Sequence, residues 1–208
     1  MCPPDIWCYL QYRLIQPQSQ MILPNRQSIR LPGYDYSQYG YYFVTICTQD
    51  RQCLFGDIVG ADPCVRPPVS PMMKLNNVGK MVNKWLIKIP ERFIGSSLDI
   101  YQIMPNHIHI IIVIENPNRG LTHGLIGLTH GSTPTHLGDI VQWFKTMSTN
   151  EYMNNVKNNN WQPFAKHLWQ RNYYEHIIRN EQELNKIREY IKTNPKMWER
   201  DRNNPATP

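Results

Sequence analysis

The sequence predicts an α+β fold in which helices pack on an antiparallel sheet. Short segments rich in β-branched and aromatic residues alternate with segments whose apolar residues recur at helical spacing. Their order is strand, helix, strand, strand, helix, strand, helix. This is the order of a ferredoxin-like split β-α-β sandwich followed by one added C-terminal helix. A chain of 208 residues is long enough to bury one hydrophobic core in such a domain.

The first half of this pattern begins with residues 41–48, which are mostly β-branched or aromatic and predict a strand. Residues 49–71 end in a stretch rich in proline and glycine, and we expect a loop there. Apolar residues then recur at helical spacing over 78–86. Two strands are expected over 98–104 and 106–115. The apolar run in the second of them predicts a central strand that is covered on both faces.

The second half follows a Gly/Thr/His-rich segment, residues 116–136, which we expect to be a loop insertion. Apolar residues at helical spacing predict a helix over 137–154, and a strand is expected over 173–178. The final helix is expected to start after Asn180, whose side chain is a favourable N-terminal cap. It should end at Asn194, because a proline follows.

The chain is expected to have three parts. Residues 1–25 show no clear period and are interpreted as an N-terminal extension. Residues 26–198 carry the whole pattern of strands and helices and form the predicted domain. Residues 199–208 are polar and contain prolines, which predicts a flexible tail.

The composition bears on partner and compartment. With 22 Lys and Arg against 16 Asp and Glu, the formal net charge is +6. A basic excess favours a polyanionic partner, because side chains that neutralise phosphates release condensed counterions. The five cysteines include no CxxC pair, which argues against a disulfide framework and a cysteine zinc site. No membrane span or secretory signal is recognisable, so we expect a cytoplasmic protein.

The motif His107-Ile108-His109 is the sharpest candidate for a metal site. Side chains two residues apart in a strand point to the same face, so the two imidazoles should stand side by side while Ile108 enters the other face. Two neighbouring imidazole nitrogens can share one divalent metal. The alternative is a pair of half-buried histidines that only satisfy their hydrogen bonds, and so short a pattern does not decide between the two.

Tyr190 and Asn194 form the second candidate feature. They are four residues apart and therefore lie one turn from each other on one face of the final helix. Read alone, the Tyr190 ring could simply extend the apolar stripe of that helix. Beside a metal, its phenolic oxygen would be a competent nucleophile toward phosphorus, and the metal would polarise the scissile phosphate. Asn194 could add a third, neutral oxygen ligand.

Three segments in the right order resemble the REP-associated tyrosine transposases. These are relatives of the single-strand insertion-sequence transposases in the HUH nuclease superfamily. The segments are Met104–His109 (MPNHIH), Leu168–Asn180 (LWQRNYYEHIIRN) and Ile187–Pro195 (IREYIKTNP). Arg30–Tyr36 also resembles the start of that family, and the similarity runs from about Arg26 to Trp198.

The resemblance implies a ferredoxin-like HUH nuclease domain that binds single-stranded DNA near an imperfect hairpin and nicks it. It implies that Tyr190 attacks the phosphodiester, leaving a 5′-phosphotyrosyl link and a free 3′-hydroxyl that can later rejoin strands. His107 and His109 match the metal pair of the superfamily, and Asn194 matches the third ligand, which is Gln in many insertion-sequence relatives. Mg²⁺ or Mn²⁺ is the implied metal, and manganese suits imidazole ligands better.

Candidate DNA contacts lie near the start of the domain and around its last strand and helix. Basic side chains there could bind phosphates, although a solvated helical face would show the same pattern. The candidates are Arg30, Tyr34, Arg171, Arg179, Lys186, Arg188 and Lys192. Trp169 and Tyr173 could either stack on bases or fill the core.

Two other functions are compatible with the sequence. A nucleic-acid-binding module of the same fold would not cut DNA, and a metal-dependent hydrolase would use activated water with Tyr190 as a packing residue. We predict the transposase-like enzyme, acting on single-stranded or hairpin DNA of palindromic repeats, with no membrane partner. The resemblance implies a monomer for the REP-associated branch. A dimer is the alternative, because insertion-sequence relatives pair and exchange their tyrosine helices.

Overall fold

A four-stranded antiparallel sheet forms the centre of the fold, with the strand order β4-β5-β1-β6. Its strands are β1 (Gly40–Cys47), β4 (Ser96–Ile103), β5 (His107–Ile114) and β6 (Tyr174–Ile178). The computed structural model describes residues 34–60, 70–115 and 135–206, all of which belong to one compact unit over 32–208. This strand order and the antiparallel pairing of all neighbours confirm the predicted α+β, split β-α-β class.

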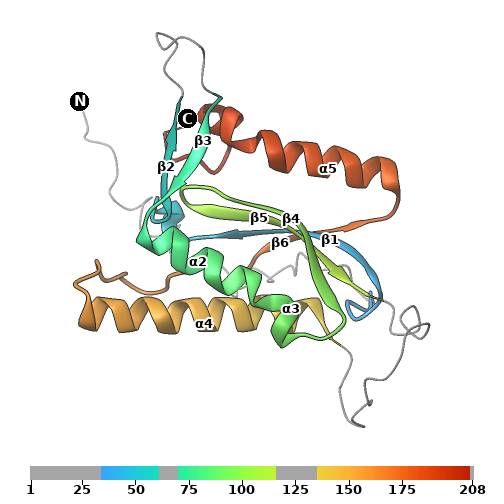
Figure 1. Cartoon of the computed structure of the whole chain (residues 1–208), viewed down its shortest axis with the longest axis horizontal. Helices are drawn as coiled ribbons and strands as arrows, with labels where there is room; N and C mark the ends of the chain where they lie inside the picture. The colour runs from blue at the N-terminus through green and yellow to red at the C-terminus, as the bar shows by residue number, and fades with distance from the viewer. Residues whose placement is uncertain (1–33, 61–69, 116–134, 207–208) are drawn as a thin grey trace, which may run out of the picture. The chain divides into compact units, whose positions relative to one another are not determined.

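Helices cover both faces of this sheet (Figure 1). On one side lie α2 (Asn77–Ile87), the short α3 (Ile89–Arg92) and the long α4 (Leu137–Asn158), and on the other lies α5 (Glu181–Thr193). The larger core cluster joins the α2 and α4 side to the sheet, with Ile108 and Ile110 of β5 fully buried in it. A smaller cluster under α5 contains Phe43, Ile111 and Leu184. The central strand β5 is therefore covered on both faces, as its apolar run predicts.

Local sequence signals explain where the helices begin and end. The side chain of Asn180 accepts a hydrogen bond from the Glu183 backbone N–H, which is the predicted cap of α5. Asn76 caps α2 in the same way through Gly79. After Thr193, where Pro195 follows, the chain continues as a 3₁₀ helix over Asn194–Arg200 instead of α-helix.

The sequence predicts a loop over residues 49–71, but the described part of this segment also contains regular structure. A 3₁₀ turn spans Gln49–Arg51, and β2 (Gly56–Val59) pairs with β3 (Met72–Leu75) as a separate two-stranded sheet. Each strand has only four residues, so its alternation is too short to stand out beside the neighbouring prolines and glycines. The helix α4 also runs past its expected end, to Asn158.

The predicted flexible tail over 199–208 is wrong for its central residues. Asp201 and Asn203 are only 8% and 6% exposed. The Arg51 guanidinium donates a hydrogen bond to the Arg202 carbonyl at 2.7 Å, and the Asn106 amide donates one to the Asn203 carbonyl at 2.6 Å. The residues that suggested a tail are instead hydrogen-bonded to groups around Arg51 and the start of β5.

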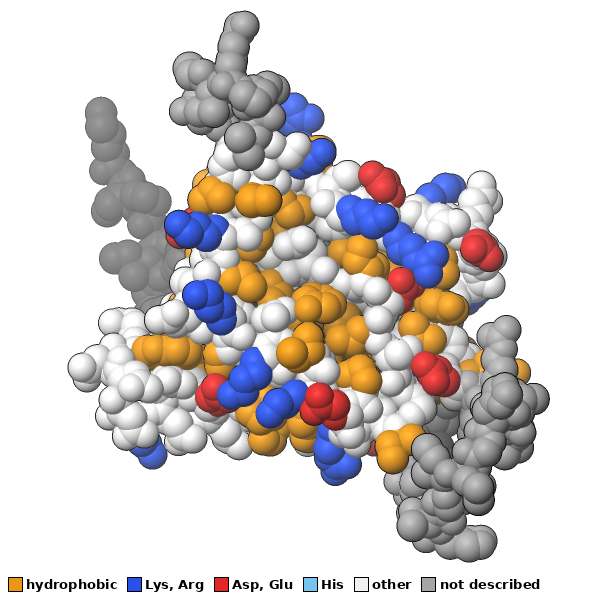
Figure 2. Space-filling model, viewed as in Figure 1, with side chains coloured by type: hydrophobic (Ala, Val, Ile, Leu, Met, Phe, Trp, Pro, Cys, Tyr) orange, Lys and Arg blue, Asp and Glu red, His pale blue; other side chains and the backbone are white. Residues whose placement is uncertain are grey.

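Two surface properties bear on function. None of the helices in the described ranges is both long and apolar enough to pass through a membrane. On the face shown in Figure 2, Lys and Arg side chains are interspersed with Asp and Glu around a group of apolar side chains. The positive net charge is therefore not gathered into a single basic patch on that face.

Candidate active site

The two histidines of β5 stand side by side in a buried site. His107 is fully buried and His109 is 2% exposed, and their Nε2 atoms are 3.0 Å apart. Both rings lie on one face of the strand, as the spacing predicts, because Ile108 enters the core on the opposite face. Two ring nitrogens thus converge on one point, which is the arrangement that a shared metal ion requires.

Asn106 fixes the orientation of the His107 ring. Its side-chain amide donates hydrogen bonds to the carbonyls of Arg51 and Asn203, at 2.9 and 2.6 Å, so its Oδ1 is left to face the ring. Since that oxygen can only accept, the proton of His107 must lie on Nδ1, 2.8 Å away. The Nε2 lone pair then points into the site. Hydrogen-bond partners such as Asn106 generally fix the orientation of metal-binding histidines in this way.

His109 is held in a comparable way. Its Nδ1 lies 2.9 Å from the hydroxyl of Thr45, on the neighbouring strand β1. Burial, together with the positive charges of Arg202 and Arg51, lowers the pKa of His107 to about 3. Burial, followed by the charge of His107, also lowers the pKa of His109 to about 3. Both rings are therefore neutral at physiological pH, as metal ligation requires.

The hydroxyl of Tyr190 reaches this pair from α5. It lies 3.3 Å from His109 Nε2, and its ring meets the His109 ring at an interplanar angle of 62°. The ring also packs edge-on against Phe43, so the packing role weighed from the sequence is present while the hydroxyl faces the histidines. With an exposed fraction of 45%, Tyr190 is accessible to a substrate.

The pKa of Tyr190 is raised, first by partial burial and then by the negative charge of Asp201. The charge of Arg202 and a hydrogen bond from the Asn194 side chain act in the opposite direction. Without a metal or a substrate the hydroxyl is therefore protonated at neutral pH. Arg202 and Asn194 are the described groups that favour its ionised form, which is the nucleophile.

Two oxygen-bearing side chains complete the site. Asn194, the predicted third ligand, is 2% exposed, and its buried Oδ1 has no hydrogen-bond partner among the described residues. Asp201 was missed by sequence reasoning, which assigned it to a tail. Its Oδ2 lies 3.8 Å from His107 Nε2, and one ligand atom each from His107, His109 and Asp201 falls within 4.8 Å of the others.

These residues fit a divalent metal. An ion about 2.1 Å from each of two imidazole nitrogens, in directions at right angles, would hold those nitrogens about 3.0 Å apart. That is the separation of the two Nε2 atoms. A carboxylate and a buried, unpartnered amide oxygen nearby supply the hard oxygen donors that Mg²⁺ and Mn²⁺ prefer.

The residues predicted to contact DNA differ in how they are placed in the structure. Arg30 lies outside the described residues. The guanidinium of Arg188 is paired with Asp99 at 2.7 Å, so it is already engaged within the protein. Tyr34 packs on Tyr36 against the larger core cluster. The remaining candidates are exposed: Arg171, Arg179, Lys186 and Lys192.

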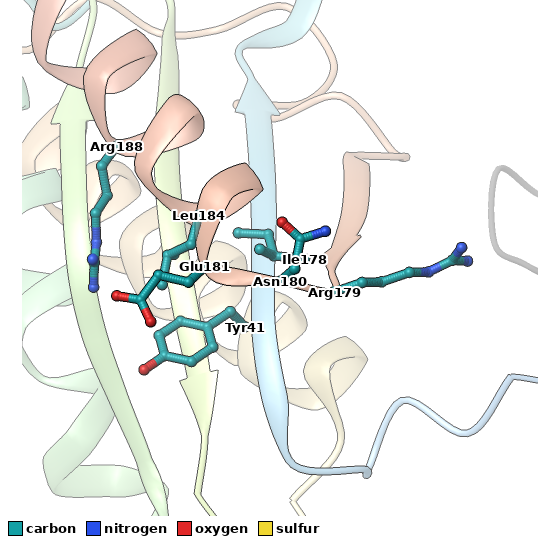
Figure 3. Close-up of a pocket in the computed structure, with 7 residues that line it drawn as sticks. All are labelled: Tyr41, Ile178, Arg179, Asn180, Glu181, Leu184 and Arg188. Atoms are coloured by element: carbon teal, nitrogen blue, oxygen red, sulfur yellow. The ribbon is translucent and has the colours of Figure 1, made fainter.

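A cavity of about 240 Å³ lies at the first turn of α5 and is separate from the histidine site (Figure 3). Tyr41 and Ile178, which line it, face each other across β1 and β6 at the end of the sheet opposite to Cys47 and His107. Arg179 and Arg188 also line it, and in Figure 3 the Arg179 side chain extends away from the other residues. The cavity therefore contains none of the metal-site or nucleophile candidates.

Arg51 and Arg202 are functional candidates that sequence reasoning missed. Both are exposed, and both lie close enough to the histidines for their charges to lower the pKa of His107. Arg51 follows Asp50, and both residues have positive φ values (54° and 53°), a strained backbone that bulky side chains seldom adopt. No sequence motif marks either arginine, because the turn and the C-terminal segment meet only in the folded chain.

The buried histidines predict a pH-dependent stability of the metal-free protein. Their pKa is depressed in the folded state, so the unfolded chain binds more protons below pH 6.5, and stability is lost as the pH falls from about 6.5 toward 3. Urea unfolding in a chelator should show a decrease of roughly 1 kcal/mol per pH unit for each histidine. His109→Gln should reduce that slope, whereas a change at the exposed His167 should not. An unchanged slope in His109→Gln would contradict the assignment.

Comparison with known proteins finds relatives in sequence and in structure. An uncharacterised protein of Haemophilus influenzae is 37% identical over 182 residues, which cover 85% of this chain and 92% of that protein. No protein-family model matches the chain.

Two solved structures are more distant. A REP-associated tyrosine transposase bound to a REP hairpin has 16% identity and a TM-score of 0.49, over 80% of this chain and 72% of that one. A protein of Deinococcus radiodurans R1, provisionally described as a transposase, has 18% identity and a TM-score of 0.40, over 79% and 95% of the two chains. The identity and coverage of the sequence relative carry the assignment: this chain belongs to the same protein family as the Haemophilus influenzae protein.

Proposed function

We propose that this protein is a metal-dependent single-stranded DNA endonuclease and strand transferase that acts on hairpin-forming repeat DNA. The observation that carries the proposal is the position of the Tyr190 hydroxyl, 3.3 Å from Nε2 of His109 in the converging histidine pair. A partly exposed tyrosine beside two neutral, oriented imidazoles is a nucleophile next to a metal site. The ordered motifs that resemble REP-associated tyrosine transposases support the same conclusion.

In the proposed reaction, the Tyr190 oxygen forms a bond to the scissile phosphorus while the bond from phosphorus to the 3′-oxygen breaks. The phenolic proton is lost and the departing 3′-oxygen gains a proton, so the products are a 5′-phosphotyrosyl enzyme and a free 3′-hydroxyl. The side chain of Asn194 and the charge of Arg202 favour the ionised tyrosine. Attack of a 3′-hydroxyl on the phosphotyrosine reverses these bond changes and joins strands.

His107 and His109 would hold the metal, with Asp201 and Asn194 as the oxygen ligands. Bound there, Mg²⁺ or Mn²⁺ would polarise the phosphate and offset the charge that develops on it. Asn106 and Thr45 keep the two rings turned toward the site through hydrogen bonds of 2.8 and 2.9 Å. We therefore propose both that Tyr190 is the nucleophile and that the reaction requires a metal ion.

Tyr190 meets the histidines of its own chain. A partner subunit is therefore not needed to bring the tyrosine to the site, which supports action as a monomer. Light scattering should give the mass of one chain for the purified protein and of one chain plus one hairpin for the complex with DNA. A stable dimer would favour the tyrosine-helix exchange of the insertion-sequence relatives.

Covalent trapping tests the proposal against its two alternatives. The protein is incubated with Mn²⁺ and hairpin DNA that has single-stranded flanks and a label at its 3′ end, which stays with the 5′-phosphotyrosyl link, and the products are separated under denaturing conditions. A labelled protein band supports the tyrosine mechanism. Tight binding without cleavage would favour the binding module, and free 5′-phosphate products without an adduct would favour a hydrolase that activates water.

The third metal ligand can be assigned with two variants. Asp201→Asn removes a charged oxygen close to His107, and we expect Mn²⁺ affinity measured by calorimetry to fall at least roughly tenfold. Asn194→Ala removes the buried, unpartnered amide oxygen and should also weaken binding, although less because that oxygen is neutral. Glu189→Gln removes a negative charge from an exposed residue of α5 and is the matched control. A variant with unchanged affinity would exclude its residue as a ligand.

A further inference from the structure

We propose that Tyr174 and Arg202 form a nucleotide-binding platform beside the histidine site. A base of the single strand next to the scissile phosphate stacks on the Tyr174 ring, and the Arg202 guanidinium binds a neighbouring phosphate. This inference rests on the proposed function, because it assigns the strand that Tyr190 attacks to a defined surface. Neither residue is among the DNA contacts that the sequence suggests.

The sheet register places Tyr174 next to the site. Thr45 of β1 is paired with Tyr174 of β6 on one side and with His109 of β5 on the other. Residues directly opposite one another in antiparallel strands share a face, so Tyr174, Thr45 and His109 form one row across that face. With neighbouring strands about 4.8 Å apart, Tyr174 lies two strands, or about 10 Å, from His109. A strand whose phosphate sits at the histidines and that continues along this row would bring its neighbouring nucleotide over Tyr174.

The Tyr174 ring is both exposed and supported. It is 40% exposed, and it packs edge-on against Phe43 with the ring centroids 6.1 Å apart. Phe43 in turn stacks on His109 at 5.5 Å, which ties the platform to the metal site. An exposed aromatic face held by packing below it is the kind of surface on which unpaired bases stack without sequence preference.

The charges around Tyr174 suit a nucleic-acid strand. The Arg202 guanidinium lies 6.0 Å from the centroid of the Tyr174 ring. The backbone carbonyl of Arg202 accepts a hydrogen bond from the Arg51 side chain. The neighbouring His176 is paired with Glu183 at 2.7 Å, and the carboxylate of Asp201 is buried near His107. Arg202 is thus an exposed cation positioned for a phosphate, which charge-assisted hydrogen bonds from a guanidinium group recognise well.

The residues that the sequence suggested for stacking do not compete for this role. Trp169 is 5% exposed and donates its indole N–H to Ser148 in the core. Tyr173 packs against the same core cluster, with the Lys145 ammonium 5.3 Å from its ring. The next residue, Tyr174, is 40% exposed and lies on the face of the sheet that carries the histidines.

The test measures the affinity of the full chain for fluorescein-labelled oligo(dT) by anisotropy, with a strand of abasic residues as the second probe. Tyr174→Leu keeps an apolar cover over Phe43 but has no aromatic face, and we expect it to bind oligo(dT) about tenfold more weakly. The abasic strand should bind wild type and Tyr174→Leu equally. Tyr174→Phe should bind oligo(dT) like wild type. Arg202→Gln should reduce the slope of log affinity against log salt by about 0.7, the value for one phosphate contact on a single strand.

Two matched controls separate this surface from exposed aromatic and basic residues in general. Tyr39 is 67% exposed just before β1, at the far end of that strand, so Tyr39→Leu should not change oligo(dT) binding. Arg92 lies 5.4 Å from the Phe93 ring, much as Arg202 lies near Tyr174, and Arg92→Gln should leave the salt slope unchanged.

The inference and the proposed function fail in different ways. If the wild type forms a covalent adduct while Tyr174→Leu binds oligo(dT) as tightly as wild type, the platform is overturned and the proposed function stands. If the wild type binds neither oligo(dT) nor hairpin DNA, the proposed function fails and the platform fails with it. A loss that appears in Tyr174→Leu, is absent in Tyr174→Phe and depends on the base supports the platform.

Discussion

Replacing Tyr190 with Phe should abolish the covalent adduct between this protein and labelled hairpin DNA. The change removes one oxygen, the atom that would form the bond to phosphorus, and keeps the ring contact with Phe43. Loss of a catalytic nucleophile generally costs on the order of a thousandfold or more in rate, so adduct should fall below detection. DNA binding and thermal stability should change little, because Tyr190 is 45% exposed and its hydroxyl loses only a long contact of 3.3 Å with His109 Nε2 and the hydrogen bond from Asn194.

The matched control is Tyr39→Phe, which removes a hydroxyl from an exposed tyrosine at the far end of β1. It should form adduct at the wild-type rate. Persistence of the adduct in Tyr190→Phe would mean that another side chain is the nucleophile. If this variant instead cut DNA without an adduct, the metal-dependent hydrolase would be the better description of the protein.

Replacing His107 or His109 with Ala should remove both metal binding and cleavage. Each change takes away one of two converging imidazole nitrogens and leaves a buried polar site incomplete. In the wild type, Mn²⁺ at 100 times its dissociation constant should stabilise the fold by about 2.7 kcal/mol. The rise in melting temperature should therefore appear in the wild type and disappear in both variants, independently of any DNA substrate.

Two further variants test this prediction even if the alanine variants are themselves destabilised. His109→Gln preserves a polar side chain at the site and serves as a milder second variant. His167→Ala, at an exposed position, should retain the full manganese response. An undiminished manganese response in both His107→Ala and His109→Ala would place the metal elsewhere and remove the basis of the proposed chemistry.

Much of the fold follows from local sequence patterns. The β-branched and aromatic run of β1, the apolar run of β5, the helical spacing in α2 and the Asn180 cap of α5 are each set by residues within a few positions of one another. The shared face of His107 and His109 is equally local, because the strand period alone determines it. The hairpin of β2 and β3 was missed because four-residue strands carry too little periodic signal.

The candidate site is a different case, because its parts come from distant segments. The pairing of Arg188 with Asp99 engages a predicted DNA contact within the protein, and it joins α5 to β4 in a way that neither local sequence reveals. In the opposite direction, Arg51 and Arg202 gain importance only because the turn after β1 and the C-terminal segment are hydrogen-bonded to each other. Their residue types are ordinary for solvated surface positions, so composition and spacing do not distinguish them.

The sequence by itself determined the order of the strands and helices, the side-by-side histidines and the helix face that carries Tyr190 and Asn194. These features depend on the fixed periods of strands and helices. Only the tertiary structure decided that Tyr190 meets His109, that Asn106 orients His107 and that Asp201 joins them. Asn106 directly precedes His107, but it orients that ring only because the fold brings its amide to the carbonyls of Arg51 and Asn203. The other two contacts link residues far apart in the chain, and they form because buried polar groups must find partners wherever the fold brings them together.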